Sequence, residues 1–406
     1  MSRTVRIFDT TLRDGEQTPG VHITPDQKVA IAHRLKAIGV TTIEAGFPIS
    51  SPGDRDAVAR IASEVRGCEI AAMARCVAQD IDAAAEALRD AERPVVHVFL
   101  GTSDIHLTKK LRLDRAGAVR AIRECVARAR RHVADVQFSA EDATRTERPF
   151  LRQCIAAAVE SGATRINLPD TVGCMLPREY GEMIRDVVRF VGPHVIVSAH
   201  CHNDMGMATA NTVAAVEGGA RQVEVTVNGI GERAGNAALE EVAVAMAMKR
   251  IAESGVDVQQ VTALSAHVAE VTRVPVQPNR AVVGANAFAH SSGIHQDGIL
   301  KDPSTYEFVP PAMVGAPGHR FVMTSRSGRG AVAHHAARMG YRLTDAQVDE
   351  VYRAFIEVAA YSDGAVDADE LARVIGAACG PPPNPTQELP PRDDPKRCRF
   401  EEVMLL

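Results

Sequence analysis

Two histidines separated by one residue carry the strongest chemical signal in this sequence. His200 and His202 stand in the segment Ser-Ala-His-Cys-His-Asn-Asp-Met-Gly, residues 198–206. Residues two apart on a β-strand point to the same side, so both imidazoles can bind one metal ion. The alternative is a pair of unrelated histidines, buried or exposed. A position at the end of a predicted strand, followed by Asn203 and Asp204, favours the metal site.

Oxygen ligands for the same ion are expected from two other segments. Asp14 lies at the end of the first predicted strand, and Asn236 ends the loop 228–236 that follows the eighth. Together with both histidines, these side chains would leave two positions of an octahedron for the keto oxygen and one carboxylate oxygen of an α-keto acid. The metal would polarise the ketone as a Lewis acid, and Arg13 could stabilise the alkoxide that forms.

The loop after the eighth predicted strand is rich in glycine and contains Gly229, Gly231 and Gly235. By itself this pattern is a weak signal for phosphate binding, since a tight turn between strand and helix also needs glycine. The corresponding region of barrel enzymes often binds phosphate groups, and the pyrophosphate of coenzyme A would fit there.

Further proton-transfer groups are expected outside the barrel. The segment 289–298 contains His290 and His295 among polar and glycine residues, and imidazoles titrate near neutral pH. A surface loop with incidental histidines is the alternative. Tyr306 could bring a hydroxyl to the same place, although a tyrosine in such a segment more often packs against its neighbours without a chemical role. The charged runs at 109–110 and 128–131 are typical of solvated helix faces and are assigned no role.

Eight short β-branched runs position these side chains. Each is followed by a helical pattern, and the first helix begins at the cap sequence Thr24-Pro25-Asp26. Alternating strands and helices indicate parallel βαβ units, and eight of them predict an α/β fold of the (β/α)8 TIM-barrel class. An open doubly wound sheet is the rival, but residues 9–17 lack its glycine fingerprint. The predicted strands are 5–8, 42–45, 69–74, 95–100, 136–140, 165–169, 195–200 and 222–226.

The alternation stops after about residue 255, and the remaining chain changes character twice. We predict a catalytic barrel over residues 1–270 and an irregular lid subdomain, rich in Gly, Pro, His and Ser, over 271–330. A helical subdomain is predicted over 331–380 and a Pro-rich tail over 381–406. The region after the barrel is therefore expected to be smaller and partly helical.

Composition argues against several classes of protein. The 406 residues, 46% of them hydrophobic, suffice for a large core. A net charge of −5 and an aromatic content of 4% give no footprint for nucleic acid. No apolar run reaches the ~18 residues of a membrane span, and no export signal is visible. The eight cysteines form no C-x-x-C pair, so we expect reduced thiols in a cytoplasmic enzyme.

Four segments of the chain resemble one known group of enzymes, the 2-isopropylmalate, homocitrate and citramalate synthases. These are Claisen-condensing, metal-dependent TIM barrels. The segments are residues 12–17 with Lys28, residues 200–211, the loop 228–236 and residues 292–301. The resemblance covers about residues 3–345 and is strongest to 2-isopropylmalate synthases at 302–315 and 325–329.

The resemblance implies a role for each candidate residue. The metal, Mn2+, Zn2+ or Mg2+, would be bound by Asp14, His200, His202 and Asn236. Arg13 would orient the keto acid and stabilise the alkoxide, and His295, helped by Tyr306, would take a methyl proton from acetyl-CoA. Glu141 would be a fourth catalytic residue. The residues implied to bind substrate are Gln17, His97, Ser139, Asn167, Pro169 and Thr171, with Thr171 on the keto-acid carboxylate.

The resemblance also implies a homodimer in which the lid of one protomer completes the site of the other. Full-length leucine-pathway synthases of this group have a C-terminal regulatory domain, whereas this chain ends in the Pro-rich tail. We therefore expect an enzyme of the 2-isopropylmalate synthase type without that domain. Synthases of secondary metabolism that make homocitrate, citramalate, benzylmalate or phosphonomethylmalate are the alternative.

Two other functions are consistent with a barrel of this kind. Hydroxymethylglutaryl-CoA lyases share the fold and the paired histidines but have a reactive cysteine in the glycine loop, and residues 228–236 contain none. A non-catalytic metabolite-binding regulator would be expected to lack Arg13, His295 or a metal ligand, and all are present. The sequence therefore favours a synthase that joins acetyl-CoA to an α-keto acid.

Overall fold

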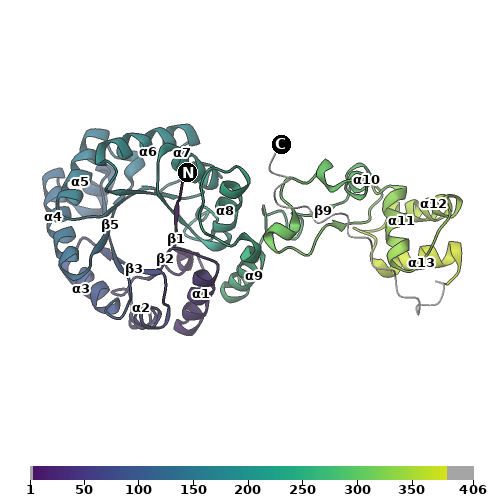
Figure 1. Cartoon of the computed structure of the whole chain (residues 1–406), viewed down its shortest axis with the longest axis horizontal. Coiled ribbons are helices and arrows are strands. Elements are labelled where there is room, and N and C mark those ends of the chain that lie inside the picture. The colour runs from purple at the N-terminus through teal and green to yellow at the C-terminus, as the bar shows by residue number, and fades with distance from the viewer. Residues whose placement is uncertain (1–2, 382–406) are drawn as a thin grey trace. The chain divides into compact units, whose positions relative to one another are not determined.

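Eight parallel strands form a closed barrel in which each strand pairs with the next and β8 pairs with β1. The computed structural model describes residues 3–381, and Figure 1 shows the strands inside a ring of helices. The predicted (β/α)8 class is thus confirmed. The strands are β1 (Arg6–Asp9), β2 (Thr42–Gly46), β3 (Glu69–Arg75), β4 (Pro94–Gly101), β5 (Asp135–Glu141), β6 (Arg165–Asp170), β7 (Ile196–Cys201) and β8 (Gln222–Val225).

Several of the helices that cover the barrel begin at strong local signals. Thr24 and Gln27 form a reciprocal capping box at the start of α1, which satisfies two backbone N–H groups that the first turn leaves unpaired. Proline stands in the first turn of α1, α2, α5 and α6, where its missing N–H costs nothing. The helices are α1 (Pro25–Ala37), α2 (Pro52–Glu64), α3 (Ala78–Ala87), α4 (Arg115–His132), α5 (Arg148–Glu160), α6 (Pro177–Val191), α7 (Ala208–Gly218), α8 (Leu239–Met248) and α9 (Val261–Thr272).

A buried polar layer fills the barrel at the start of its strands. The guanidinium of Arg165 donates to Glu69 at 2.8 Å and to Gln222 at 3.2 Å. Burial favours the neutral acid, but the hydrogen bond and charge of Arg165 lower the pKa of Glu69 to about 2. These paired charges fill the interior at the end where the strands begin, and active sites of such barrels lie at the opposite end, where the strands finish.

The chain divides into two compact units, and the division differs from the predicted segments. The barrel unit comprises Met1–Ala287 and Ala312–Ala316, and the second unit comprises Phe288–Pro311 and Pro317–Leu406. Residues 312–316 belong with the barrel because Val314 is fully buried and its carbonyl accepts a hydrogen bond from Thr262 at 2.6 Å. Long-range packing of this kind leaves no periodic signal in the sequence.

The second unit has its own core. Buried apolar residues such as Val332, Phe355 and Ile375 pack together across α11 (Arg329–Arg338), α12 (Asp345–Tyr361) and α13 (Ala368–Cys379). Ahead of them, β9 (Ala289–His290) pairs in parallel with β10 (Arg320–Phe321), and α10 (Gly293–Lys301) lies between the two strands in sequence. Residues 382–406 of the predicted tail lie outside the described residues. No helix within residues 3–381 is long and apolar enough to cross a membrane.

Candidate active site

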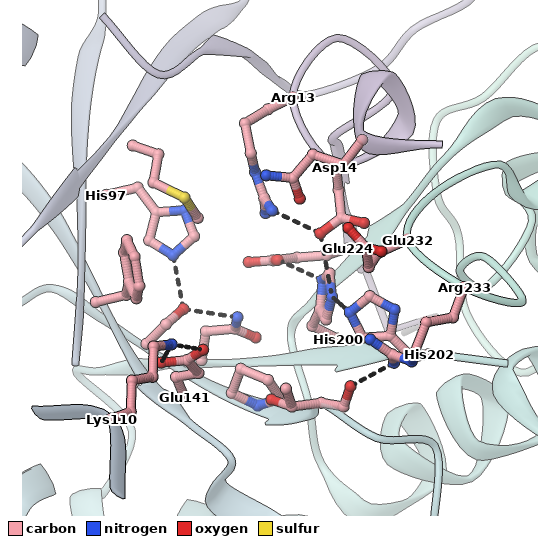
Figure 2. A pocket seen from close by; sticks show the side chains of 17 residues that line it. Arg13, Asp14, His97, Lys110, Glu141, His200, His202, Glu224, Glu232 and Arg233 are labelled. Carbon is pink, nitrogen blue, oxygen red and sulfur yellow. Dashed lines mark hydrogen bonds and ion pairs between the residues drawn. The ribbon is translucent and has the colours of Figure 1, made fainter. Parts of the chain in front are cut away.

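A pocket of about 300 Å³ opens at the C-terminal ends of the barrel strands. Figure 2 shows side chains from strands around the barrel pointing into it. Eleven of the residues proposed from the sequence line this one pocket: Arg13, Asp14, Gln17, His97, Ser139, Glu141, Asn167, Pro169, Thr171, His200 and His202. The closure of the barrel brings them together from separate strands and the loops that follow them.

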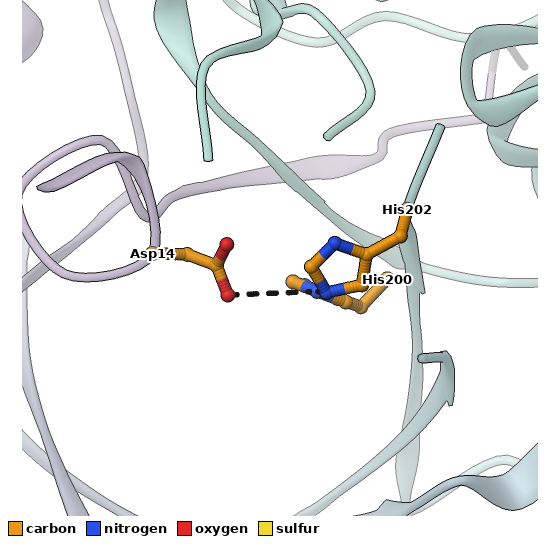
Figure 3. A group of neighbouring side chains, drawn as sticks. All are labelled: Asp14, His200 and His202. Atoms are coloured by element: carbon orange, nitrogen blue, oxygen red, sulfur yellow. Dashed lines mark hydrogen bonds and ion pairs between the residues drawn. The ribbon is translucent and has the colours of Figure 1, made fainter. Parts of the chain in front are cut away.

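Asp14, His200 and His202 form a group whose ligand atoms all lie within 4.8 Å of one another, and all three are buried (Figure 3). The Nε2 atoms of His200 and His202 are 3.1 Å apart, and Oδ2 of Asp14 is 3.9 Å from Nε2 of His200. A cation bound between them would explain why two ring nitrogens face each other beside a carboxylate. The group is therefore a possible metal site.

Glu224 supports this site from behind and was not anticipated. Its carboxylate lies 2.9 Å from Nδ1 of His200 and accepts a hydrogen bond from Gln137 at 2.6 Å. A carboxylate on the far nitrogen holds the proton at Nδ1, so that the lone pair of Nε2 faces the metal position. The available signal was a glutamate among the buried apolar residues of β8.

Asn236 lies against the same group. Its amide nitrogen donates to Oδ1 of Asp14 at 2.7 Å and to the carbonyl of Ile230 at 3.1 Å. The backbone of His202 pairs with that of Asn236. The buried oxygen of the Asn236 amide has no hydrogen-bond partner among residues 3–381, and a buried polar atom rarely stays without one. This oxygen fits the role of a fourth ligand.

The electrostatics of the group suit a cation. Burial raises the pKa of Asp14, but Arg13, His200, His202 and Asn236 bring it below its ordinary range. Burial and the neighbouring His200 lower the pKa of His202 to about 4. Near neutral pH, Asp14 is therefore ionised and His202 neutral, which are the forms that bind metal.

The three glycines of the loop after β8 are required by its backbone. Gly229, Gly231 and Gly235 have φ values of +62°, +151° and +87°, which side chains rarely adopt. A Cβ on Gly231 would lie 2.1 Å from the amide nitrogen of Asn236, and one on Gly235 would lie 1.9 Å from the carbonyl oxygen of Gly229. The sequence left open whether these glycines form a tight turn or bind phosphate. The tight turn is observed, and binding of the coenzyme A pyrophosphate stays a proposal.

We expect Gly231→Ala to weaken metal binding by roughly 10- to 100-fold, the usual effect of losing a group that orients a ligand. The added methyl would displace Asn236 and, through it, Asp14. Gly192→Ala is the control, since Gly192 has φ +75° and a Cβ at this position would meet no described atom within 4 Å. Metal titration by isothermal calorimetry measures the effect, and wild-type affinity in Gly231→Ala would contradict it.

On the other side of the pocket, hydrogen bonds connect the residues proposed to bind the keto acid. Arg13 donates to Asp14 at 2.5 Å and to Glu44 at 2.7 Å. Glu44 also lies 2.5 Å from Nδ1 of His97, whose Nε2 is 2.6 Å from the Ser139 hydroxyl. Burial opposes the charge of Arg13, but Glu44 and Asp14 raise its pKa, so it remains a cation. Glu44, on β2, was not anticipated.

The Thr171 hydroxyl is oriented for a ligand. Its oxygen accepts a hydrogen bond from the backbone N–H of Asp142 at 2.9 Å, which leaves the hydroxyl proton free to donate. The side chain of Arg233 donates to the Thr171 carbonyl at 2.6 Å and to both carboxylate oxygens of Asp204, at 2.7 and 2.9 Å. Arg233 therefore joins the loops after β6, β7 and β8 at the rim of the pocket.

The position of Lys110 differs from the one expected from the sequence. It was assigned to a solvated helix face without a role, but it lines the pocket and donates to both oxygens of Glu141, at 2.7 and 2.9 Å (Figure 2). It lies on a π-helical turn, His106–Leu111, after β4, and such turns are frequent at functional sites. Phe99 and Glu232 also line the pocket without having been anticipated.

His295 and Tyr306 belong to the second unit and lie side by side there. Their ring centroids are 4.2 Å apart, and the tyrosine ring covers Gly298, where a Cβ would lie 2.6 Å from ring carbon Cε2. The sequence analysis expected Tyr306 at the same place as His295, and the two rings are neighbours, one on α10 and one just after it. Neither residue is among those that line the barrel pocket.

A closed (β/α)8 barrel with two histidines and an aspartate clustered at its strand ends defines a barrel protein with a possible metal site. The HMGL-like family model matches residues 4–268, and a homocitrate synthase post-HMGL domain-like model matches residues 282–363. The chain belongs to the HMGL-like family, and among its members it is an alkylmalate synthase, a transferase.

Two relatives show how far the similarity extends. The 2-isopropylmalate synthase of Pyrococcus furiosus is 50% identical over 374 residues, 91% of this chain and 75% of that protein. The 2-isopropylmalate synthase of Pelotomaculum thermopropionicum is 51% identical over 364 residues, 88% of this chain and 72% of that protein. The similarity includes both the barrel and most of the second unit.

Solved structures support the fold. Hydroxymethylglutaryl-CoA lyase from Pseudomonas aeruginosa aligns with a TM-score of 0.56 at 21% identity, covering 71% of this chain and 97% of that one. The carboxyl transferase domain of Rhizobium etli pyruvate carboxylase aligns with a TM-score of 0.55 at 13% identity, covering 93% of this chain and 60% of that one. At these identities the likeness shows the shared fold alone.

Proposed function

We propose that this chain condenses acetyl-CoA with 2-ketoisovalerate to give 2-isopropylmalate and free CoA. The observation that carries the proposal is about 50% identity to 2-isopropylmalate synthases over nine-tenths of the chain. The pocket supports it independently, because the cluster of Asp14, His200 and His202 lies beside a largely buried arginine and an oriented threonine hydroxyl.

The metal site would be formed by Asp14, His200, His202 and Asn236, which offer two nitrogen and two oxygen atoms. This mixed set suits Mn2+, Zn2+ or Mg2+. When bound, the cation would polarise the ketone of the substrate. Glu224 would hold His200 in the binding tautomer, and Arg13 would keep Asp14 ionised.

The keto acid would be oriented by protein groups around the cation. Thr171 would donate its hydroxyl proton to the carboxylate, and Arg13 would stabilise the alkoxide that forms. Glu141, paired with Lys110, would serve as a further acid–base group at the rim. The remaining walls would be formed by Gln17, His97, Ser139, Asn167 and Pro169.

The methyl proton of acetyl-CoA would be taken by His295 with the help of Tyr306. The resulting enolate carbon would attack the ketone, and water would then hydrolyse the thioester. We propose a homodimer in which the second unit of one copy completes the site of the other, and a coenzyme A pyrophosphate bound at the loop of Gly229, Gly231 and Gly235. A cytoplasmic location, consistent with seven free thiols among the described residues, is part of the same proposal.

The acceptor is predicted from the walls of the pocket. Met73, Phe99 and Pro169 provide apolar surface, and the nearby cation of Lys110 is already paired with Glu141. A branched apolar side chain therefore fits better than a second carboxylate or a phosphonate. One methylene changes binding by only about 1–3 kcal/mol, so a panel of acceptors is required.

We expect 2-ketoisovalerate to give the highest kcat/KM in a panel that includes pyruvate, 2-ketoglutarate, phenylpyruvate and a phosphonate-bearing keto acid. Release of CoA, followed with a thiol reagent, measures the rate for each. A preference greater than about tenfold, or 1.4 kcal/mol, for another acceptor would assign the chain to a different alkylmalate synthase.

A further inference from the structure

Three side chains of the second unit form a hydrogen-bonded chain that has no part in the function proposed so far. Oε2 of Glu307 lies 2.6 Å from Nε2 of His319, and Nδ1 of His319 lies 3.1 Å from Nε2 of His290. His290 and His319 are brought together by the pairing of β9 with β10. The side chains of Glu307 and His319 are each only 17% exposed, so the chain is largely sheltered from water.

The carboxylate at one end sets the tautomer of both imidazoles. An ionised Glu307 can only accept, so the proton of neutral His319 is on Nε2. Nδ1 of His319 must then accept from Nε2–H of His290. Neutral His290 therefore has its lone pair on Nδ1, and the direction of this basic atom is set by the hydrogen bond to His319, which Glu307 orients in turn.

His290 is suited to act as a base beside His295. Burial, His319 and His295 lower the pKa of His290, which keeps the ring neutral near neutral pH. The amide of Gln296, the residue after His295, donates to the His290 carbonyl at 2.9 Å, so β9 and α10 are joined. The second unit thus contains two neighbouring imidazoles, and only that of His295 has a proposed role.

The reaction needs a second base, because His295 carries a proton once it has deprotonated the acetyl methyl group. We propose that His290, oriented by His319 and Glu307, is the general base for hydrolysis of the thioester, an inference that rests on the proposed function. Nδ1 of His290 takes a proton from water while the water oxygen bonds to the thioester carbon. When the C–S bond breaks, that proton passes to the thiolate, and the new carboxylic acid loses its own proton to solvent.

A single-turnover experiment separates the two halves of the reaction. In His290→Gln we expect condensation to proceed and hydrolysis to slow by about 10²-fold or more, the usual contribution of a general base. The CoA thioester of the condensation product would then accumulate and be seen by mass spectrometry after acid quenching. Equal slowing of condensation and CoA release, or wild-type hydrolysis, would overturn the assignment. His194→Gln, at an exposed histidine of the barrel unit, is the control.

The tautomer provides a test that does not depend on turnover. In protein labelled with 15N-histidine, we expect the Nε2–H form of His290 in the wild type and a mixture of forms in Glu307→Gln. A wild-type His290 protonated at Nδ1 would overturn the hydrogen-bonded chain. If the wild type condenses no keto acid, the proposed function fails and the hydrolytic role fails with it, whereas the tautomer result still decides whether Glu307 orients His290.

Discussion

Replacement of His200 by alanine is expected to remove the bound cation and to lower kcat by about 10²–10³-fold, the range for losing one stabiliser of a developing oxyanion. Nε2 of His200 faces Nε2 of His202 at the proposed metal position, and Glu224 contacts Nδ1 of the same ring. Without it, Asp14, His202 and Asn236 would have to bind the ion with one nitrogen ligand fewer.

Metal content by mass spectrometry and CoA release with 2-ketoisovalerate measure the two effects on the same preparation. His194→Ala, at an exposed histidine, should retain both. Glu224→Gln should have an effect between those of the two histidine variants, with metal affinity lowered about 10- to 100-fold. The reason is that Glu224 orients a proposed ligand without touching the ion. A His200→Ala protein that binds metal as the wild type does would exclude His200 as a ligand.

The second large effect is expected in His295→Ala, which should retain its metal and lose turnover by about 10²–10⁴-fold. His295 is in the second unit, beside Tyr306, and is not among the residues of the barrel pocket. Its loss would therefore remove the proposed base for enolate formation and leave the proposed metal ligands in place.

Exchange of the acetyl-CoA methyl protons with deuterated water reports on this step directly. We expect exchange in the presence of the keto acid to stop in His295→Ala while metal content stays unchanged. His22→Ala, a largely exposed histidine of the barrel unit, serves as the matched control. Wild-type exchange and turnover in His295→Ala would remove this residue from the mechanism.

Local patterns were sufficient to predict the barrel and most of the residues of the possible metal site. The eight strands are short and almost wholly buried, so most of them contain short apolar runs that are visible in the sequence without any pairing partner. His200 lies on β7 and His202 follows the last residue of that strand, and their spacing of two residues makes their common direction a local property. Asp14 could be added because all strands of a barrel end on the same face.

Residues that act through distant partners were not predictable in this way. Glu44 forms hydrogen bonds with Arg13 and His97, and Glu224 forms them with His200 and Gln137. These contacts exist only after the barrel has closed. Lys110 was misassigned because a lysine in a charged run is usually solvated, and only the structure shows its two hydrogen bonds to Glu141. The pairing of His290 with His319 likewise depends on two strands far apart in the sequence.

Metal-dependent release of CoA is the most direct measurement of the proposed condensation. Wild-type protein should release CoA from acetyl-CoA only when an α-keto acid is present, with 2-ketoisovalerate the best acceptor. Chelation should abolish this release, and addition of Mn2+, Zn2+ or Mg2+ should restore it. Metal-replete protein that releases no CoA with any acceptor, or a rate that chelation leaves unchanged, would contradict condensation at the site of Asp14, His200 and His202.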